Sequence, residues 1–401
     1  MTGKVTTALI IGGGIAGPVA AMALQRAGIE AAVYEAYART ADGVGAGLSI
    51  APNGRRALEV LGAGHVVDDI GVPMTSMVLR SSTGKRLATF PVEGARTVAR
   101  AELYRNVYDE AISRGIRYEH GKRLVRAEQD ADGVTAHFAD GTSARADVLI
   151  GADGIRSTVR TQLDPNAPEP SFTGLNSAGG WARGTGLPST HGETHMVFGK
   201  RAFFGYQVFD DGDALWWINL PSAEPLTVAQ MQRTPNAEWL RRFRELAAED
   251  NSPVTSIIDA VTPQELVLTA ASEYLPHVPT WHRGRITLIG DAAHAPSSSS
   301  GQGASLSLED AVELARCLRD LPTAAEAFAA FESLRRPRID RVMKDTERTN
   351  SGKTASAFGR VLRDLLFPVA MKLFAKPEKS AWLTGYAIDW NAPVTAAPVA
   401  A

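Results

Sequence analysis

The stretch TALIIGGGIAGPVAAMALQRAGIEAAVYE, residues 7–35, decides the fold. It begins with a short apolar run rich in β-forming residues, continues with apolar residues at helical spacing, and reaches a helix stop at Gly28. A second strand pattern follows at 30–35. A strand, a glycine turn, a helix and a strand make a βαβ unit, which requires parallel strands and a right-handed crossover. We therefore expect an α/β protein built on a Rossmann-like parallel sheet.

Two later apolar runs have the same character as the first strand. Residues 146–151 lead into ADGIRSTVR and residues 285–290 lead into DAAHA, so we expect both runs to join the same sheet. Between them, residues 172–283 contain strand-like pieces separated by DDGD and by Pro/Ser turns. This pattern predicts an antiparallel β-sheet inserted into the first domain. After residue 304 the chain is expected to be helical.

The composition excludes several classes of protein. The 401 residues carry a formal net charge of −2 and are 44% hydrophobic, which suits a globular chain and favours neither nucleic acid nor an anionic membrane as a partner. The single cysteine, Cys317, lies in an apolar pattern and allows no internal disulfide. The N-terminus lacks signal-peptide features, and no apolar stretch has the length of a membrane span. We expect a cytoplasmic protein with no stable membrane association.

The first chemical motif is the glycine triplet Gly12-x-Gly14-x-x-Gly17. Glycines allow a tight turn after the strand and a close approach of backbone amides to a pyrophosphate, and the helix N-terminus adds positive partial charge. Glu35 ends the next strand, where a carboxylate can accept hydrogen bonds from a ribose. An ordinary glycine turn is the alternative. Because an acid at this position disfavours a ribose 2′-phosphate, the pattern predicts FAD or NAD rather than NADP.

Five motifs together resemble those of the class A FAD-dependent aromatic hydroxylases, a monooxygenase family with the para-hydroxybenzoate hydroxylase fold. They are GGGIAG with Glu35, GAGLSIAPNGRRAL (45–58), TVARAELYRNV (97–107), GADGIRSTVR (151–160) and GDAAHAP (290–296). The resemblance implies a discontinuous FAD-binding domain at 1–171 and 284–350, a substrate-binding β-sheet domain at 172–283 and a C-terminal helical segment at 351–401. It implies FAD contacts from Gly12, Gly14, Ile15, Ala16, Gly17, Glu35, Ala36, Gly47, Arg100, Asp153, Gly290, Asp291, Gly301, Gly303 and Ala304.

Three of these expected contacts can also be argued physically. Asp291 follows an expected strand, and open parallel sheets bind ligands at the C-terminal ends of their strands, where a carboxylate can accept hydrogen bonds from ribityl hydroxyls. Gly301 and Gly303 precede a helix whose free amides and dipole suit negative charge on the pyrimidine edge of a reduced flavin. A plain helix start is the alternative for the two glycines. For Asp153, the alternative is a simple turn before a helix.

The middle sheet is expected to supply the substrate wall. Aromatic faces suit a flat ring, but strand alternation lets only about half of the side chains face the site. The residues expected to line it are Phe204, Tyr206, Trp217, Asn219 and Pro296. The serines at 297–300 either make the wall more polar, which suits a substrate with several oxygens, or form a solvated loop.

The resemblance also implies a mechanism. NADPH or NADH would reduce FAD, O₂ would add to the reduced ring as a C4a-hydroperoxide, and one oxygen atom would pass to an aromatic or polyketide-like small molecule. His294 is expected to position other groups, and no catalytic residue or metal site is assigned. Two alternatives stay open: an FAD-dependent oxidase or reductase without oxygen insertion, and a ligand-sequestering flavoprotein. Ile218 and Leu220 break the Trp-x-Trp-x-Ile-Pro signature of flavin-dependent halogenases.

Overall fold

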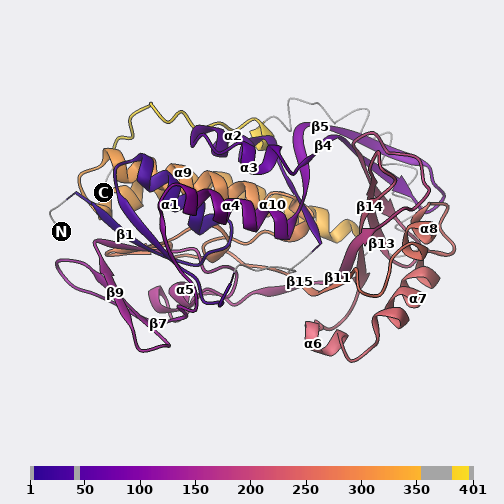
Figure 1. The fold of residues 1–401 in the computed structure, drawn as a ribbon, viewed down its shortest axis with the longest axis horizontal. Coiled ribbons are helices and arrows are strands. Elements are labelled where there is room, and N and C mark those ends of the chain that lie inside the picture. Colours follow the sequence, from indigo (N-terminus) through magenta and orange to yellow (C-terminus); the bar gives the residue numbers. More distant parts are fainter. Residues whose placement is uncertain (1–3, 40–45, 354–381, 397–401) are drawn as a thin grey trace.

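The computed structural model describes residues 4–39, 46–353 and 382–396 (Figure 1). The first strand of the chain lies inside a six-stranded sheet. Its strands, in spatial order, are β16 (His282–Arg283), β17 (Ile286–Leu288), β10 (Val148–Gly151), β1 (Thr7–Ile11), β2 (Glu30–Tyr34) and β6 (Arg117–Glu119). All neighbours in this sheet are parallel except β16 and β17. The prediction that three distant apolar runs join one parallel sheet is confirmed.

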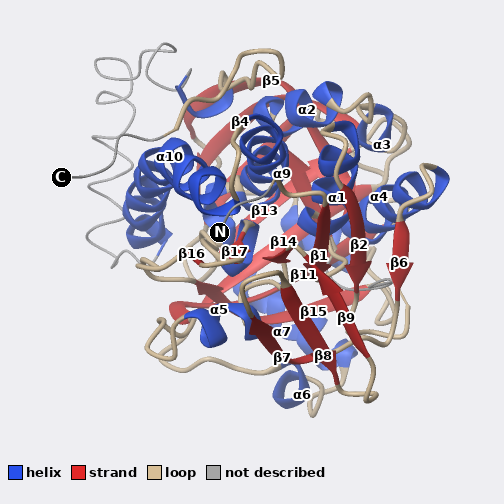
Figure 2. Cartoon of the chain, turned by 90° about the vertical axis from the view of Figure 1, so that its left-hand side faces the viewer, coloured by secondary structure: helices blue, strands red, loops and turns tan. Residues whose placement is uncertain are grey.

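Helices cover one face of this sheet and a small sheet covers the other (Figure 2). α1 (Ala16–Arg26) is buried from Ala16 to Leu24, because its small residues let it pack against both β1 and α9 (Gly303–Asp320). α10 (Ala324–Lys353) packs on α9. The other elements of this part are α2 (Pro52–Val60), α3 (His65–Asp68), α4 (Arg100–Ser113), α5 (Thr158–Leu163), β7 (Leu124–Gln129), β8 (Val134–Phe138) and β9 (Ser143–Ala146).

An eight-stranded sheet forms the second part of the molecule, at the right of Figure 1. Its strands, in spatial order, are β15 (Leu266–Tyr274), β11 (Ser171–Ala182), β14 (Ala214–Pro221), β13 (Phe203–Val208), β12 (Glu193–Phe198), β4 (Val72–Ser81), β5 (Arg86–Ala99) and β3 (Gly47–Ile50). Neighbours are antiparallel except β12 and β4. The expected segment 172–283 supplies β11 to β15, whereas β3, β4 and β5 come from residues 47–99, where the sequence pattern predicted no strands.

Contacts between non-neighbouring strands show that this large sheet is curled. Thr97 of β5 donates a hydrogen bond of 2.7 Å to Gln207 of β13, although β12 and β4 lie between the two strands. A Cβ atom added to Gly47 of β3 would lie 2.7 Å from Leu215 of β14. These side chains therefore point into a concave face. The convex face packs against α7 (Asn236–Ala247) and α8 (Val254–Asp259), with α6 (Val228–Met231) before them in the chain.

The end of the described chain returns to the first part of the molecule. Residues 382–396 lie against α2 and α9, where Arg56 donates to the carbonyl oxygen of Tyr386 at 3.2 Å and Arg316 donates to that of Asp389 at 2.8 Å. Most of the segment expected to be helical at 351–401 lies outside the described residues, at 354–381 and 397–401.

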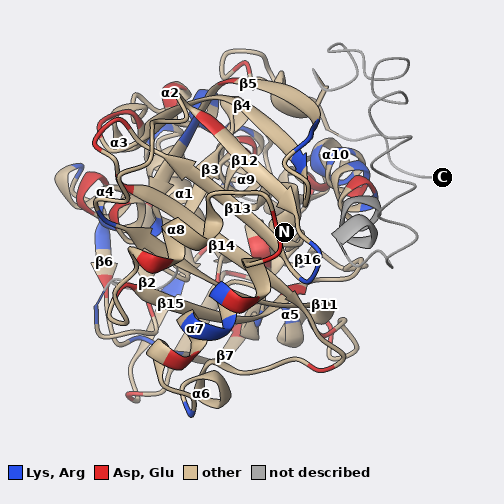
Figure 3. Cartoon of the chain, turned by 90° about the vertical axis from the view of Figure 1, so that its right-hand side faces the viewer, with Lys and Arg blue, Asp and Glu red and all other residues tan. Residues whose placement is uncertain are grey.

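Charges of both signs are interspersed on the side of the molecule drawn in Figure 3. This distribution agrees with the formal net charge of −2. Within the ranges that the structure describes, none of the helices combines the length and the apolar character needed to cross a membrane.

Candidate functional site

The glycine triplet makes its turn through close backbone packing. Gly12 has a φ of +109°, and an added Cβ would lie 2.3 Å from the carbonyl oxygen of Ala152. A Cβ on Gly17 would lie 1.9 Å from the carbonyl oxygen of Gly12. A Cβ on Gly14 would meet nothing within 4 Å. Two glycines are therefore required by the fold itself, while the third leaves open space at the N-terminus of α1, as a pyrophosphate site requires.

Glu35 follows β2 and is held beside this turn. Its carboxylate accepts hydrogen bonds from the backbone amides of Gly13 at 2.7 Å and Tyr37 at 2.8 Å. The hydroxyl of Tyr118 donates to the carbonyl oxygen of Gly13 at 2.8 Å, which fixes the turn from the other side. Ala36 follows directly and is half-buried. The acid and the glycine turn therefore form one local unit, as the sequence pattern predicts.

The three expected FAD motifs meet in space. A Cβ on Gly12 would lie 2.9 Å from the Cα atom of Asp153, and one on Gly290 would lie 3.3 Å from the Cβ atom of Ala16. Ala16 is the first residue of α1, and Ile15 is its N-cap. Segments separated by more than a hundred residues in the chain therefore converge at the C-terminal ends of β1, β10 and β17.

The carboxylate of Asp153 binds the start of α5. It accepts hydrogen bonds from the Ser157 hydroxyl and from the backbone amides of Thr158 at 2.8 Å and Val159 at 3.1 Å. Burial raises the pKa of Asp153, and these hydrogen bonds act in the opposite direction. Arg156 next to it is paired with Glu273 at 2.8 Å. These contacts fit the turn before a helix, and a contact of Asp153 with FAD remains a prediction.

Asp291 lies beside the start of α9. A Cβ on Gly303 would be 3.8 Å from the Oδ1 atom of Asp291 and 3.8 Å from Pro296. Although Asp291 is exposed, desolvation by the surrounding protein raises its pKa, while the nearby charges of His294 and Arg100 lower it. Arg100 donates to the Tyr104 hydroxyl through Nε at 3.0 Å and Nη2 at 2.7 Å.

The first turn of α9 begins without a capping side chain. Gln302 is the N-cap and makes no capping hydrogen bond, so the amides that follow it, including that of the half-buried Ala304, have no side-chain acceptor there. Gly301 has a left-handed φ of +60°, and its Cβ position lies 3.7 Å from the hydroxyl of Ser49 in β3. Ser49 pairs with Thr97 in register and shares its concave face, so this face reaches the turn at 301–303.

The expected substrate residues divide between the two faces of the large sheet. Trp217 and Asn219 alternate with Leu220, Ile218 and Trp216 along β14, and Asn219 donates to the Ser177 hydroxyl at 2.8 Å. The Trp217 indole covers Gly205, whose added Cβ would lie 2.0 Å from the Trp217 Cζ2 atom. Gly205 and Trp217 are directly opposite each other on β13 and β14, so their side-chain positions share one face. The residues next to them in each strand point to the convex face, so Gly205 and Trp217 lie on the concave face.

Phe204 and Tyr206 lie on the convex face. They are paired with Ile218 and Trp216, and all four belong to the core that packs against α7 and α8. The structure therefore does not bring Phe204 and Tyr206 together with Trp217 and Asn219. Tyr206 instead lines a separate cavity of about 690 Å³ on the convex side, together with Leu187, His195, Val208 and Pro253. The sequence predicted that side chains of these strands alternate between two faces, but it did not predict which residues lie on which face.

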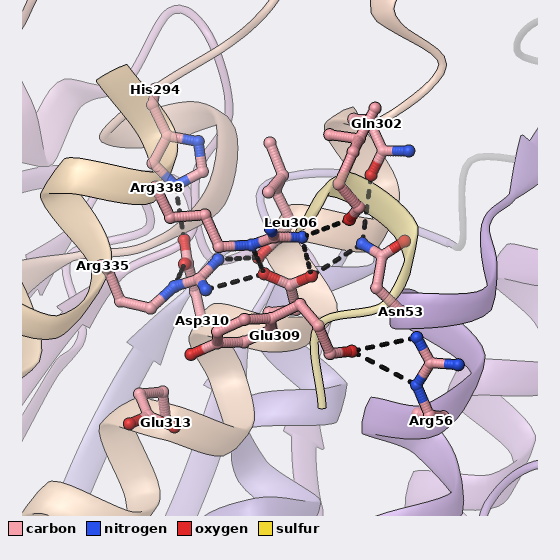
Figure 4. Close-up of polar contacts among 12 residues, drawn as sticks. Asn53, Arg56, His294, Gln302, Leu306, Glu309, Asp310, Glu313, Arg335 and Arg338 are labelled. Carbon is pink, nitrogen blue, oxygen red and sulfur yellow. Dashed lines mark hydrogen bonds and ion pairs between the residues drawn. The ribbon is translucent and has the colours of Figure 1, made fainter. Parts of the chain in front are cut away.

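A buried ionic cluster beside the FAD motifs was missed by the sequence analysis (Figure 4). Glu309 and Asp310 of α9 are both fully buried and form ion pairs with Arg335 of α10 at 2.7 Å each. The available signal was the pattern LEDAVE within an otherwise apolar helix. Among the described residues there is no group of three or more His, Cys, Asp or Glu that could hold a metal ion.

The chain matches the FAD binding domain family over residues 5–346. It is 33% identical over 353 residues to an FAD-dependent urate hydroxylase of Klebsiella pneumoniae, covering 85% of this chain and 89% of the relative. It is 29% identical to a 3-hydroxybenzoate 6-hydroxylase of Klebsiella oxytoca, covering 91% and 93%. The solved structure of Klebsiella pneumoniae HpxO complexed with FAD and uric acid superposes with a TM-score of 0.81 at 25% identity, covering 92% of this chain and 94% of that one.

This protein belongs to the class A FAD-dependent aromatic hydroxylases. It is accordingly an FAD-dependent monooxygenase, and FAD is its cofactor. The glycine turn, Glu35 and the turn at Gly290 and Asp291 converge as binding of one extended dinucleotide requires.

Proposed function

We propose that this enzyme uses NADPH or NADH and O₂ to insert one oxygen atom into a flat aromatic or polyketide-like molecule. The observation that carries this substrate class is Trp217, whose half-buried indole lies over Gly205 on the concave face that reaches the turn at 301–303. An indole face of this kind suits stacking on a planar ring. Urate and 3-hydroxybenzoate, named in relatives, are ring compounds of this class.

The proposed substrate wall consists of Trp217, Asn219 and Pro296. Asn219 lies on the same strand face as Trp217 and would orient a polar group at the edge of the ring. Pro296 lies beside Gly303 and would border the wall on the side of the FAD motifs.

The proposed FAD contacts assign a task to each motif. The open side of Gly14 and the amides at Ile15, Ala16 and Gly17 would hold the pyrophosphate, with Glu35 and Ala36 at the ribose. The remaining contacts, at the ribityl chain and the ring, would come from Gly47, Arg100, Asp153, Gly290, Asp291, Gly301, Gly303 and Ala304.

FAD, when bound, supplies the electron transfer from the nicotinamide and the activation of O₂. The uncapped amides of α9 would stabilise negative charge at the pyrimidine edge of the cofactor. Asp291 would accept hydrogen bonds from the ribityl chain, and the concave face would keep water from the reacting atoms. The fully buried Cys317, whose pKa burial raises, takes no part in this scheme. We also propose a cytoplasmic location, where the nicotinamide cofactor is supplied.

The test is oxidation of NADH and NADPH by the purified, FAD-loaded protein in the presence of a panel of phenols, quinones and purine-like rings. We expect a ring compound to stimulate oxidation and to gain one oxygen atom, which adds about 16 mass units under ordinary O₂ and about 18 under ¹⁸O₂. Stimulated oxidation that releases only hydrogen peroxide would indicate an oxidase. Tight ligand binding without any nicotinamide oxidation would indicate a sequestering protein. Stimulation by aliphatic amines or thiols alone would contradict the proposed substrate class.

A further inference from the structure

Two adjacent carboxylates on α9 lie in the interior of the protein and share one arginine (Figure 4). Arg335 reaches Glu309 through Nη1 and Asp310 through Nε, each at 2.7 Å, and all three side chains are at most 1% exposed. The mutual attraction of a buried ion pair is largely offset by the loss of hydration, so such a cluster is weak evidence for stability. Its other hydrogen bonds indicate what else it does.

Asp310 binds both ends of the turn that carries Asp291. Its Oδ2 atom accepts a hydrogen bond of 2.9 Å from the backbone amide of Gly290 and one of 2.5 Å from Nε2 of His294. Asp291 lies between these two residues. Arg335 and His294 keep the pKa of Asp310 at about 2 in spite of its burial, so the group is an ionised acceptor at any working pH. His294 must then present a proton on Nε2, which fixes the orientation of its ring.

Glu309 leads to the second loop beside the expected flavin site. Its carboxylate accepts a hydrogen bond of 2.6 Å from the side-chain nitrogen of Asn53. The same nitrogen donates to the side-chain oxygen of Gln302 at 3.0 Å, directly before Gly303. Arg338 adds two further hydrogen bonds to Glu309, at 2.8 Å each. A single cluster therefore connects to the turn at 290–294 and to the start of α9.

We propose that Asp310 and Glu309, joined by Arg335, are positioning residues that hold these two loops in the geometry that binds FAD. Each carboxylate acts through the backbone or side chain of a loop residue and contacts neither cofactor nor substrate. Because Arg335 keeps its second carboxylate, we expect the loss of one carboxylate charge to leave the apoprotein folded and to release the loop that the missing group holds. The variant should then bind FAD more weakly and should couple a smaller share of nicotinamide oxidation to product formation.

Glu313 provides a matched control on the same helix. It is 1% exposed and forms an ion pair with Arg316 at 2.5 Å. Arg316 in turn donates to the carbonyl oxygens of Asp389 and Ala392 near the chain end. Glu313 is thus a buried, ion-paired carboxylate whose partner leads away from the FAD motifs. A purely structural role of buried carboxylates predicts similar results for Asp310→Asn, Glu309→Gln and Glu313→Gln.

The experiment titrates FAD into the three full-length apoproteins and follows the quenching of flavin fluorescence, alongside the melting temperature of each apoprotein. We expect Asp310→Asn to raise the FAD dissociation constant at least 10-fold and Glu309→Gln at least 3-fold, with Glu313→Gln within 2-fold of wild type. The apoprotein melting temperatures of the three variants should be similar. A dissociation constant for Asp310→Asn equal to that of Glu313→Gln would overturn the proposal.

A second variant keeps the test decisive if Asp310→Asn does not fold. Arg335→Lys retains the positive charge but cannot bridge both carboxylates with a planar fork. We expect it to raise the FAD dissociation constant at least 3-fold and to increase hydrogen peroxide released per nicotinamide oxidised. An unchanged dissociation constant in Arg335→Lys would refute the positioning role. Because FAD binding is measured directly, this outcome does not depend on the proposed substrate.

Discussion

The edge of the parallel sheet and the concave face of the large sheet would contribute to the proposed site by different physical means. At the edge, backbone approaches backbone, so that a Cβ on Gly12 or Gly17 would collide with carbonyl oxygens. On the concave face, side chains rather than backbone atoms would form the contacts. The role of a residue there depends on which face of the strand its side chain occupies. Trp216 and Trp217 are neighbours in β14, yet Trp216 belongs to the core against α7, whereas Trp217 lies on the concave face, where we propose that the substrate binds. A site can thus depend on glycines at one end and on strand phase at the other.

The largest expected effect separates these two tryptophans. Trp216→Ala removes a side chain that is 1% exposed and packs against Phe243, with ring centroids 6.2 Å apart. We expect a loss of about 3–5 kcal/mol in the free energy of unfolding, because a cavity replaces the indole. Trp217→Ala should lose far less stability but raise the substrate KM at least 10-fold. Thermal unfolding of both apoproteins and steady-state kinetics of the FAD-loaded enzymes measure the two effects.

A reversal of this pattern would contradict the assignment of the two faces. If Trp216→Ala changed KM while the melting temperature stayed at the wild-type value, the convex face would be the substrate face. The FAD dissociation constant serves as the control, since neither tryptophan belongs to the FAD motifs.

The next effect distinguishes the glycines of the triplet. Gly17→Ala places a Cβ 1.9 Å from the carbonyl oxygen of Gly12, and we expect it to cost about 3 kcal/mol through overpacking against rigid backbone. Gly14→Ala adds a Cβ with nothing within 4 Å, so the apoprotein should melt within about 2 °C of wild type. It should nevertheless weaken FAD binding at least 10-fold, because the methyl group enters the space left for the cofactor. Equal FAD affinity of Gly14→Ala and wild type would show that the pyrophosphate does not lie there.

This difference between the two regions also explains what the sequence could predict. The convergence of the glycine triplet, Glu35 and the turn that carries Asp291 could be predicted, because glycines and acids at fixed spacing after strands permit few alternative arrangements. Their contacts with FAD stay predictions. The phase of β13 and β14 could not be predicted, because apolar residues occupy both faces of these strands and give no alternation. The strands at 72–81 and 86–99 were missed because their polar, exposed positions obscure the pattern. The Glu309 and Asp310 cluster was missed because its partner Arg335 lies 25 residues further along the chain.

A smaller effect tests the support beneath Trp217. Gly205→Ala would place a Cβ 2.0 Å from the Trp217 ring and should displace the indole into the concave face. We expect kcat/KM for the ring substrate to fall about 10-fold, which corresponds to about 1.4 kcal/mol. FAD affinity should not change. If Trp217→Ala and Gly205→Ala are combined, the loss should not exceed that of Trp217→Ala alone, since both act on the same ring. Additive losses would mean that Gly205 acts independently of Trp217.

The smallest expected effect concerns His195, which titrates on the convex face. Burial lowers its pKa below the usual value, against the opposing effect of Glu193, to which it donates through Nε2 at 3.1 Å. Arg80 donates to its Nδ1 atom at 3.1 Å, and this contact requires an unprotonated Nδ1. Tyr206, whose pKa burial raises to about 12, also contacts Nδ1, at 2.8 Å, and stays neutral.

Because the folded state resists protonation of His195, acid should destabilise it. As the pH falls below about 6.5, the unfolded chain takes up a proton that the folded chain does not, so stability decreases until the pH reaches the lower folded pKa. His195→Gln keeps a donor for Glu193 and an acceptor for Arg80 without this titration. We expect its melting temperature to fall about 1–2 °C less than that of wild type between about pH 7.5 and about pH 5.5, an interval that brackets the ordinary histidine pKa of about 6.5 in the unfolded chain. FAD affinity should respond to pH equally in both proteins. The convex core is separate from the FAD motifs, so we expect no effect of His195 on FAD binding. If FAD affinity depended on pH in wild type but not in His195→Gln, the two faces would be coupled and this expectation would be wrong.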